Sequence, residues 1–380
     1  MLVKDIKVKI YPNKKQKVLI EKHFGCCRFT YNFGLERKIK TYTENKKSIG
    51  VYAIQKEIPQ LYNEKPWLKE VNSQSLQQTL QDLDSAFSHF FKKNNSFPKF
   101  KSKHNKKQSF RVPQHFIVNI EIKAIKVPKL KWIKFKDKFN VPKGVVFRNI
   151  TISRDGSEYF AALCYDENKT NSTLSPIKKE KTLGIDLGIT NLATFSDGTK
   201  VENPKHFKKC EDELTLEQQK LSKKENKDSK AYQKQKQKVQ EVYKKIKNTR
   251  KDFLHKLTTK LAKNQSWTTF VMEDLAVKQM EQNNYTPMSK AIGDAGWRML
   301  RTMLEYKCFD QGKNFLIIGR FEPSSKACSV CGHIYQELGR EETEWVCSEC
   351  KTHHDRDVNA ANNIKSFGLI KARASALTNV

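Results

Sequence analysis

The sequence predicts an α+β chain that is built from several domains. Short strands separated by turns occupy residues 110–165, helical blocks lie on both sides of them, and two Cys-x-x-Cys hooks follow near residue 330. At 380 residues the chain is also long enough for two or three domains. We therefore expect a β-domain combined with helices, followed by a second mixed domain that carries a cysteine ribbon.

The first half is predicted to be a small β-barrel domain interrupted by helices. Residues 2–10 alternate apolar and charged side chains, as a half-buried strand does. This strand is expected to complete the β-domain formed by the strands of 110–165, which makes the helical block between them an insertion. The expected domains are a β-barrel of 1–10 and 109–170 and a helical domain of 11–108.

Within the helical block, residues 73–92 form one clear amphipathic helix. Its apolar stripe is core, and its opposite face carries Gln74, Gln77 and Gln78. A glutamine amide can bond bidentately to adenine in a major groove. Exposed glutamine is equally ordinary on a helix, and the residues alone favour that ordinary interpretation.

The second half begins with a glycine-flanked apolar strand, residues 181–191, that contains Asp186. Burying a carboxylate in such a run is costly unless it is paired, so Asp186 is either hydrogen-bonded or bound to a cation. The strand is followed by a hairpin turn at 196–199. Ribonuclease-H-like folds begin in this way, and heat-shock and sugar-kinase ATPases open with a very similar strand, so the pattern alone leaves both open.

A long basic helical region, residues 205–263, comes next. Its cations include Arg250, Lys251 and Lys256, which share a helix with His255 and an aromatic residue. A solvated face is the simplest interpretation, but the mixture favours a groove that tracks phosphates.

The remaining elements alternate strands and helices. We expect a buried strand at 267–272 ending in Glu273, a loop at 285–294, a helix near 297–308 and a strand at 315–318. A last helix starts around Asp357, and the tail 369–380 is expected to be flexible.

Charge and cysteine content limit the partners and the compartment. Lys and Arg number 72 against 41 Asp and Glu, a net charge of +31 that favours nucleic acid as a partner. No apolar run reaches about 18 residues, so no membrane span is expected. The first residues start a strand rather than a signal peptide, and nine cysteines, an odd number, suit a reducing compartment, so we expect a cytoplasmic protein.

Four cysteines have the spacing of a tetrahedral zinc site. They form two Cys-x-x-Cys hooks separated by a β-length spacer: Cys328, Cys331, Cys347 and Cys350. Four thiolates would close the coordination sphere, so Zn2+ would be structural. His333, His353 and His354 are then spare, and we expect them on the surface or facing nucleic acid.

Three acids far apart in sequence each stand at the end of a strand or the start of a helix. They are Asp186, Glu273 and Asp357. Clustered carboxylates suit Mg2+ (or Mn2+), and two such ions can hydrolyse a phosphodiester. Hairpin strand, later strand and terminal helix are the order of a ribonuclease-H-type triad, and we expect the neighbouring Asp274 and Asp355 to be structural.

The chain resembles the TnpB (OrfB) proteins of bacterial and archaeal insertion sequences, which have a RuvC-like domain. The motifs that carry the resemblance are Gly184-Ile185-Asp186-Leu187-Gly188, Met272-Glu273-Asp274-Leu275, the four-cysteine ribbon, the run from Asp355 to Ala361, the run from Phe24 to Asn32, and Ser109-Phe110-Arg111. The resemblance implies an RNA-guided DNA endonuclease with the triad at Asp186, Glu273 and Asp357, the last chosen over Asp355 because relatives keep the acid two residues before Asn-Ala-Ala.

The resemblance also assigns the domains. It implies a wedge-like β-barrel, a helical recognition domain, a RuvC-like nuclease of 178–322 and 353–368, and a ribbon of 323–352 that binds target nucleic acid. Gln74, Gln77 and Gln78 become candidates for reading a short transposon-adjacent DNA motif, with Arg111, Arg250, Lys251, His255 and Lys256 as further nucleic-acid contacts.

The implied partners are a guide RNA from the transposon end and double-stranded target DNA, with no membrane and no obligate protein partner. Three alternatives stay open: a catalytically silent DNA-binding regulator of the same fold, an ATPase of the heat-shock fold, and a transposase that joins strands itself. The intact triad argues against the first, the lack of a second phosphate loop against the second, and the lack of a catalytic tyrosine motif with paired histidines against the third.

Overall fold

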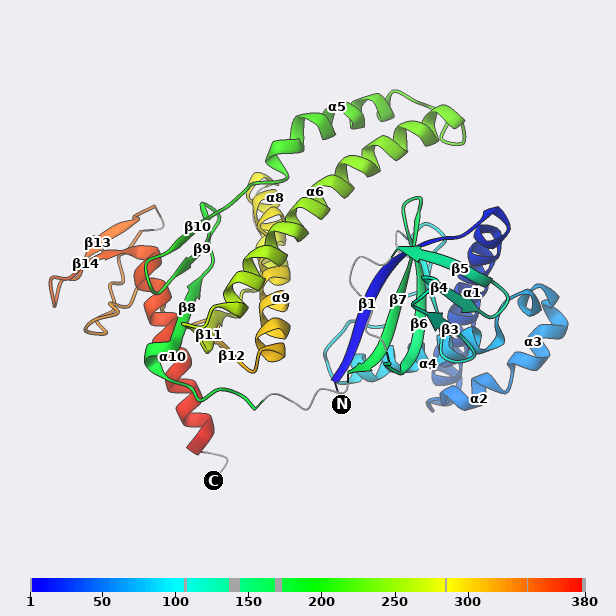
Figure 1. Cartoon of the computed structure of the whole chain (residues 1–380), viewed down its shortest axis with the longest axis horizontal. Coiled ribbons are helices and arrows are strands. Elements are labelled where there is room, and N and C mark those ends of the chain that lie inside the picture. The colour runs from blue at the N-terminus through cyan, green and yellow to red at the C-terminus, as the bar shows by residue number, and fades with distance from the viewer. Residues whose placement is uncertain are drawn as a thin grey trace. The chain divides into compact units, whose positions relative to one another are not determined.

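The computed structural model describes residues 2–105, 108–136, 144–167, 173–283, 286–339 and 341–377 (Figure 1). The chain divides into two compact units, residues 1–170 and 171–380, and each is described by itself. Within the described residues, no helix has the length and apolarity that crossing a membrane requires.

The first unit combines a seven-stranded antiparallel sheet with helices. Its strand order is β2-β6-β7-β1-β5-β4-β3. The strands are β1 (Leu2–Tyr11), β2 (Gln108–Val112), β3 (Ile117–Asn119), β4 (Ala124–Val127), β5 (Lys131–Lys136), β6 (Phe147–Asp155) and β7 (Glu158–Glu167). The helices are α1 (Lys14–Asn45), α2 (Val51–Gln55), α3 (Ile58–Glu64), the 3-10 helix η1 (Pro66–Glu70) and α4 (Ser73–Phe91).

The N-terminal strand belongs to this sheet, as the sequence predicted, and lies in its middle. β1 pairs with β7 on one side and with β5 on the other, and Val8 and Ile10 are buried. The helices between β1 and β2 are therefore an insertion in the sheet's connectivity.

The expected closed barrel is not what the described residues form. β2 and β3 stand at the two ends of the strand order, so the sheet keeps two edges. The apolar face that a barrel would close on itself is covered by helices instead, since Ile20 and Phe24 of α1 and Leu76 of α4 share one core with the strands. The helical block and the sheet thus form one unit with a common core.

The second unit is built on a five-stranded mixed sheet with the order β10-β9-β8-β11-β12. β8, β9 and β10 are antiparallel neighbours, while β11 runs parallel to both β8 and β12. The strands are β8 (Thr182–Asp186), β9 (Asn191–Phe195), β10 (Lys200–Glu202), β11 (Thr269–Glu273) and β12 (Asn314–Ile318), with a two-stranded ribbon of β13 (Glu344–Val346) and β14 (His353–Asp355). The helices are η2 (Lys179–Lys181), η3 (Lys208–Cys210), α5 (Glu211–Ser222), α6 (Lys230–Lys263), α7 (Val277–Asn283), α8 (Thr286–Ala295), α9 (Trp297–Asp310) and α10 (Arg356–Leu377).

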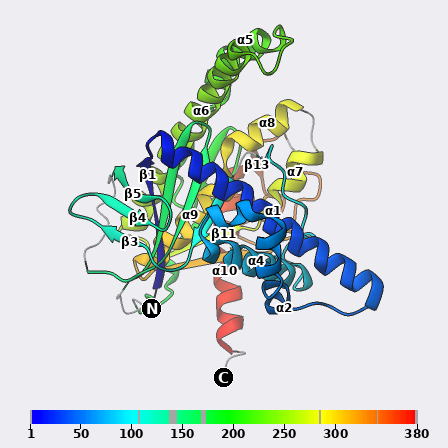
Figure 2. The same cartoon turned by 90° about the vertical axis from the view of Figure 1, so that its right-hand side faces the viewer.

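The basic region forms a helical hairpin. Figures 1 and 2 show α5 and α6 side by side, extending away from the sheet of the same unit. A small cluster of Leu214, Val239, Val242 and Ile246 joins the two helices. The second half of α6 also buries Leu254 and Leu261 in the core of the unit, so the polar, solvent-facing part of the hairpin is α5 and the first half of α6.

Three boundaries differ from the sequence expectation. Most of the expected loop 285–294 lies in α8, because Ile292 and Ala295 are buried in the unit's core and this outweighs a cost of about 1 kcal/mol for Gly293 within a helix. α10 continues to Leu377, past the point at which the tail was expected to begin. β14 pairs with β13, so the ribbon reaches beyond residue 352 and runs directly into α10.

Helix α10 lies unusually close to the five-stranded sheet. A methyl carbon added at Gly184 of β8 would lie 2.0 Å from the carbonyl oxygen of Ala361, and one added at Gly368 would lie 2.4 Å from Cγ1 of Val271 in β11. Two glycines therefore allow the helix to lie close to two adjacent strands, with backbone against backbone at Gly184 and helix backbone against the Val271 side chain at Gly368.

We expect Gly184→Ala to destabilise the second unit by about 1–3 kcal/mol, because the new methyl meets backbone that cannot move alone. Gly50→Ala is the matched control, since an added methyl there meets nothing within 4 Å. Calorimetric unfolding of both variants measures the difference. Unfolding midpoints equal to that of the unmodified chain for both would contradict the close contact.

Candidate functional site

Two of the predicted acids end adjacent parallel strands. The register of β8 and β11 pairs Ile185 with Met272, and the next residues are Asp186 and Glu273. Because the carboxyl ends of parallel strands meet at one edge of a sheet, both carboxylates lie at the same edge, and both are half-buried.

Asp357 reaches this edge from the last helix. Ala361, which contacts Gly184, lies one turn after Asp357, and Gly184 lies two residues before Asp186. The contact between α10 and β8 thus directs the first turn of the helix toward the strand end. The structure brings the three acids into one electrostatic group.

The electrostatics of Asp186 reflect this grouping. Burial, together with the negative charges of Glu273 and Asp357, raises the pKa of Asp186 to about 7, and burial is the largest of these causes. Burial also raises the pKa of Glu273. The hydroxyl of Ser324 donates a hydrogen bond to Oε1 of Glu273, which lowers this pKa and offsets part of the effect of burial. Grouped carboxylates that are costly to ionise in this way are suited to binding a cation.

The carboxylates are nevertheless more widely spaced than the cysteines of the ribbon. Among the residues that the structure describes, only the four cysteines form a group of three or more potential ligands whose ligand atoms all lie within 4.8 Å of one another.

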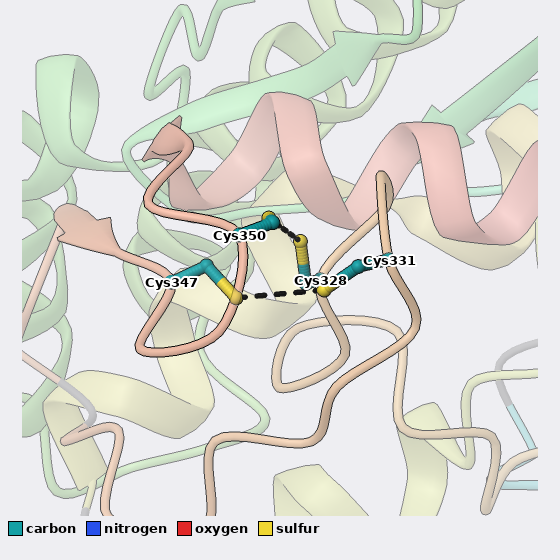
Figure 3. A group of neighbouring side chains, drawn as sticks. All are labelled: Cys328, Cys331, Cys347 and Cys350. Atoms are coloured by element: carbon teal, nitrogen blue, oxygen red, sulfur yellow. Dashed lines mark hydrogen bonds between the residues drawn. The ribbon is translucent and has the colours of Figure 1, made fainter.

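The four cysteines converge as the spacing predicted (Figure 3). The Sγ atoms of Cys328 and Cys350 are 3.6 Å apart, as are those of Cys331 and Cys347. A zinc ion with Zn–S bonds of about 2.3 Å would place its sulfurs about 3.8 Å apart, whereas a disulfide needs about 2.05 Å. The donor set and its spacing fit a tetrahedral zinc ion.

The structure buries one of the three spare histidines, all of which were expected on the surface or facing nucleic acid. His354 is buried, its ring lies 4.7 Å from that of Trp345, and its Nε2 lies 3.1 Å from Sγ of Cys328. β14 places alternate residues on opposite faces, so His353 is exposed while His354 faces the cysteines. His354 supports a thiolate rather than nucleic acid.

The ribbon is tied to α10 by two buried asparagines that sequence reasoning missed. Asn359 Oδ1 accepts from the backbone N–H of Ser329 at 2.8 Å, and its Nδ2 donates to Ala327 O at 2.8 Å. Asn363 Nδ2 donates to the same oxygen at 2.6 Å and to Ser324 O at 2.8 Å. Their spacing of four residues, on the helix face that also carries small alanines, was the available signal.

The acids next to the candidate triad have structural partners, as the sequence predicted. Asp274 pairs with Arg301 at 2.6 Å and with Arg320 at 2.9 Å. Asp355 accepts from the backbone N–H of Val358 at 3.0 Å, which caps α10.

A cavity of about 460 Å³ opens beside Glu273. Arg298, Arg301 and Arg320 line it, and Arg298 is exposed. Cationic side chains therefore stand next to the carboxylate edge.

Of the basic residues proposed to contact nucleic acid, Arg250 has a structural role instead. Its Nη2 lies 2.7 Å from Oδ1 of Asp294, which is only 7% exposed and also accepts from the backbone N–H of Phe207. This ion pair gives the Arg250 guanidinium a buried structural partner. Lys251 and Lys256 are exposed, Lys256 beside Asp252, and His255 is half-buried.

The candidates of the first unit lie on α4 and β2. Gln77 is exposed, whereas Gln74 Nε2 donates to Gln114 and Gln78 Nε2 donates to Asp82. Arg111 pairs with the same Asp82 at 3.3 Å. The structure gives these side chains a shared polar surface without assigning them a ligand.

Three family models match the chain. One described as "Probable transposase" matches residues 162–284, one described as "Cas12f1-like, TNB domain" matches 297–364, and one described as "Helix-turn-helix domain" matches 1–47. Within 2–47 the structure has one strand and one long helix rather than two helices joined by a turn.

Curated relatives align along nearly the whole chain. A "Putative RNA-guided DNA endonuclease" of Streptomyces pristinaespiralis is 34% identical, covering 96% of this chain and 89% of that protein. A "Putative RNA-guided DNA endonuclease InsQ" of Escherichia coli K12 is 32% identical, covering 95% and 91%. The solved "mini-RNA-guided endonuclease CRISPR-Cas_phi3" shares the fold, with a TM-score of 0.52 and 8% identity over 97% of this chain and 92% of that chain.

We expect Asn363→Ala to loosen the segment 324–329, because it removes the donor to two carbonyl groups and leaves that of Ser324 unsatisfied, at a cost of about 1–3 kcal/mol. Asn362→Ala is the matched control, since Asn362 bonds only within its own helix. Hydrogen exchange of the 324–329 amides should accelerate in the first variant and not in the second. Equal protection in both would show that Asn363 does not hold the ribbon.

Proposed function

Because the chain belongs to the TnpB (OrfB) family of insertion-sequence proteins, we propose that it is an RNA-guided DNA endonuclease of a transposable element. The observation that carries the proposal is the meeting of Asp186 and Glu273 at the ends of β8 and β11, with Asp357 directed toward them by α10. The names of the relatives from Streptomyces and Escherichia support the same activity. In this proposal the five-stranded sheet with α10 is the RuvC-like nuclease domain.

Asp186, Glu273 and Asp357 would hold Mg2+ (or Mn2+). Carboxylate oxygens are the ligands that these hard cations prefer, and burial, which raises the pKa of both Asp186 and Glu273, makes a cation a favourable partner for the ionised carboxylates. Two bound ions would stabilise the charge that develops on phosphate oxygens during hydrolysis of the phosphodiester.

The chain's own cations would position the DNA strand. Arg298 is exposed in the cavity beside Glu273 and would contact a phosphate of the strand that enters it. Arg301 and Arg320 are held by Asp274, so they line the same cavity in fixed positions. Ser324 would orient the Glu273 carboxylate through its hydrogen bond.

The four cysteines would hold a structural Zn2+. Four thiolates leave no open coordination position, so this ion would take no part in hydrolysis. The ion would fix the position of Cys328 and of its neighbours Ala327 and Ser329. It would thereby also fix the hydrogen bonds of these two residues with Asn359 and Asn363.

Recognition would divide between protein and RNA. The net charge of +31 suits a chain that holds a guide RNA from the transposon end together with double-stranded target DNA. Guide pairing would read the sequence, and the first unit, with Gln77 exposed on α4, would read the short motif next to the cut.

Asp186→Ala should abolish cleavage of a plasmid that carries the flanking motif, in the presence of RNA from the transposon end. Removing a metal ligand forfeits several kcal/mol of charge stabilisation, which is about a thousandfold or more in rate. Asp197→Ala is the matched control, because Asp197 lies in an exposed turn. Cleavage by the Asp186 variant at the rate of the unmodified chain would refute the assignment.

Binding of the divalent ion should weaken as the pH falls below about 7. The raised pKa of Asp186 means that a proton occupies the carboxylate below that value, and the ion must displace it, so affinity drops up to about tenfold per pH unit. Electron paramagnetic resonance of Mn2+ titrated into the zinc-loaded chain measures this without nucleic acid. Identical affinities at about pH 6 and about pH 8 would show that Asp186 does not bind the ion.

A further inference from the structure

An exposed aromatic cluster stands at the end of α4 and in the segment that follows it. Phe91 is 72% exposed, Phe100 56% and Phe97 44%. Phe97 lies edge-on against Phe87 and Phe90, with ring centroids 5.4 and 5.3 Å apart. Large aromatic rings gathered in water in this way mark a surface that is covered by a ligand or partner.

The segment that presents these rings is anchored. The backbone N–H of Lys101 donates to Oδ1 of Asn32 at 2.7 Å, and Nδ2 of Asn32 donates to Lys101 O at 2.9 Å. Pro98 is buried, and Nζ of Lys101 lies 3.9 Å from the centroid of the Tyr31 ring. The exposed rings therefore stand on a backbone that is fixed to α1.

The segment that carries the rings is basic. Residues 87–105 contain five lysines and no acidic residue; the lysines are Lys92, Lys93, Lys99, Lys101 and Lys103. Phe91 is followed by two of them, and Phe100 stands between two. Rings that alternate with cations match a strand in which bases alternate with phosphates.

The strand that fits must have unpaired bases. A duplex keeps the faces of its bases stacked inside and would use only the lysines, whereas single-stranded bases can stack on exposed rings whatever their sequence. We propose that residues 87–101 form a stacking platform for single-stranded RNA, with bases on Phe91 and Phe100 and phosphates at Lys92, Lys93 and Lys99. The choice of RNA over DNA, and its identification as an unpaired part of the guide, rest on the proposed function.

Binding of a fluorescein-labelled ten-nucleotide uridine RNA to the full chain tests the platform. The double variant Phe91→Ala, Phe100→Ala should bind it at least about tenfold more weakly, while binding of an RNA duplex should change little. Phe91→Leu, Phe100→Leu keeps the apolar area but lacks a ring face, and should lose as much. Tyr52→Ala, which removes a ring of equal 72% exposure elsewhere in the first unit, should bind normally.

The salt dependence separates rings from lysines. Loss of the rings should leave the slope of log affinity against log salt unchanged, and Lys92→Gln, Lys93→Gln should reduce it by about one to two. A thymidine DNA of the same length distinguishes the source of the strand, because a ring-dependent loss confined to DNA would overturn the assignment to RNA.

Three other results would also overturn the platform. They are unchanged uridine binding by both double variants, normal binding by the leucine variant alone, and a dimer in sedimentation that the alanine variant abolishes. Since none of these measurements requires cleavage, a chain that binds uridine RNA through its rings and never cuts DNA would refute the proposed function and leave the platform standing.

Discussion

The backbone contact between α10 and β8 is the constraint on which the second unit depends. The carbonyl oxygen of Ala361 lies so close to Gly184 that position 184 has no room for a side chain. Gly368 of the same helix likewise leaves room for the side chain of Val271 in β11, the strand next to β8. A helix fixed at two points on adjacent strands has little freedom to slide or rotate. Its first turn, which carries Asp357, is thereby fixed relative to the ends of β8 and β11.

The same helix connects the carboxylate edge with the cysteine ribbon. Asn359 and Asn363 bond to the segment around Cys328, while Ser324 at the start of that segment donates to Glu273. Buried amide groups tolerate few geometries, because each lost hydrogen bond leaves a polar atom unsatisfied. The ribbon, the helix and Glu273 therefore form one polar network, in which three hydrogen bonds lead from Ala327 through Asn363 and Ser324 to the Glu273 carboxylate.

The sequence predicted those parts of the second unit whose signal lies within a few consecutive residues. The glycine-flanked strand around Asp186, the strand ending in Glu273 and the two cysteine hooks each carry their signal within a few residues, and each stands where it was expected. The misses depend on contacts between distant residues. Arg250 was assigned to a phosphate because Asp294, its buried partner, lies far along the chain, and His354 was assigned to the surface because its burial follows from the pairing of β14 with β13. The described strands form an open sheet instead of the expected barrel for the same reason, because no short stretch of sequence shows that α1 and α4 cover the sheet.

Net charge alone does not locate a nucleic-acid surface in this chain. Lys313 is buried, and Lys307 donates to His255 O, Thr258 Oγ1 and Thr259 Oγ1 at 2.7–2.8 Å, so both contribute to the count of cations without facing a ligand. Exposed lysines without neighbouring rings attract any polyanion equally, because their attraction is to the phosphate backbone. Selection between paired and unpaired strands requires a second kind of contact, and an exposed ring supplies it because only an unpaired base can leave its own stack. In the first unit, several exposed rings and exposed lysines coincide in the segment anchored by Asn32, and that coincidence, rather than the total of +31, is the evidence for a surface that selects unpaired strands.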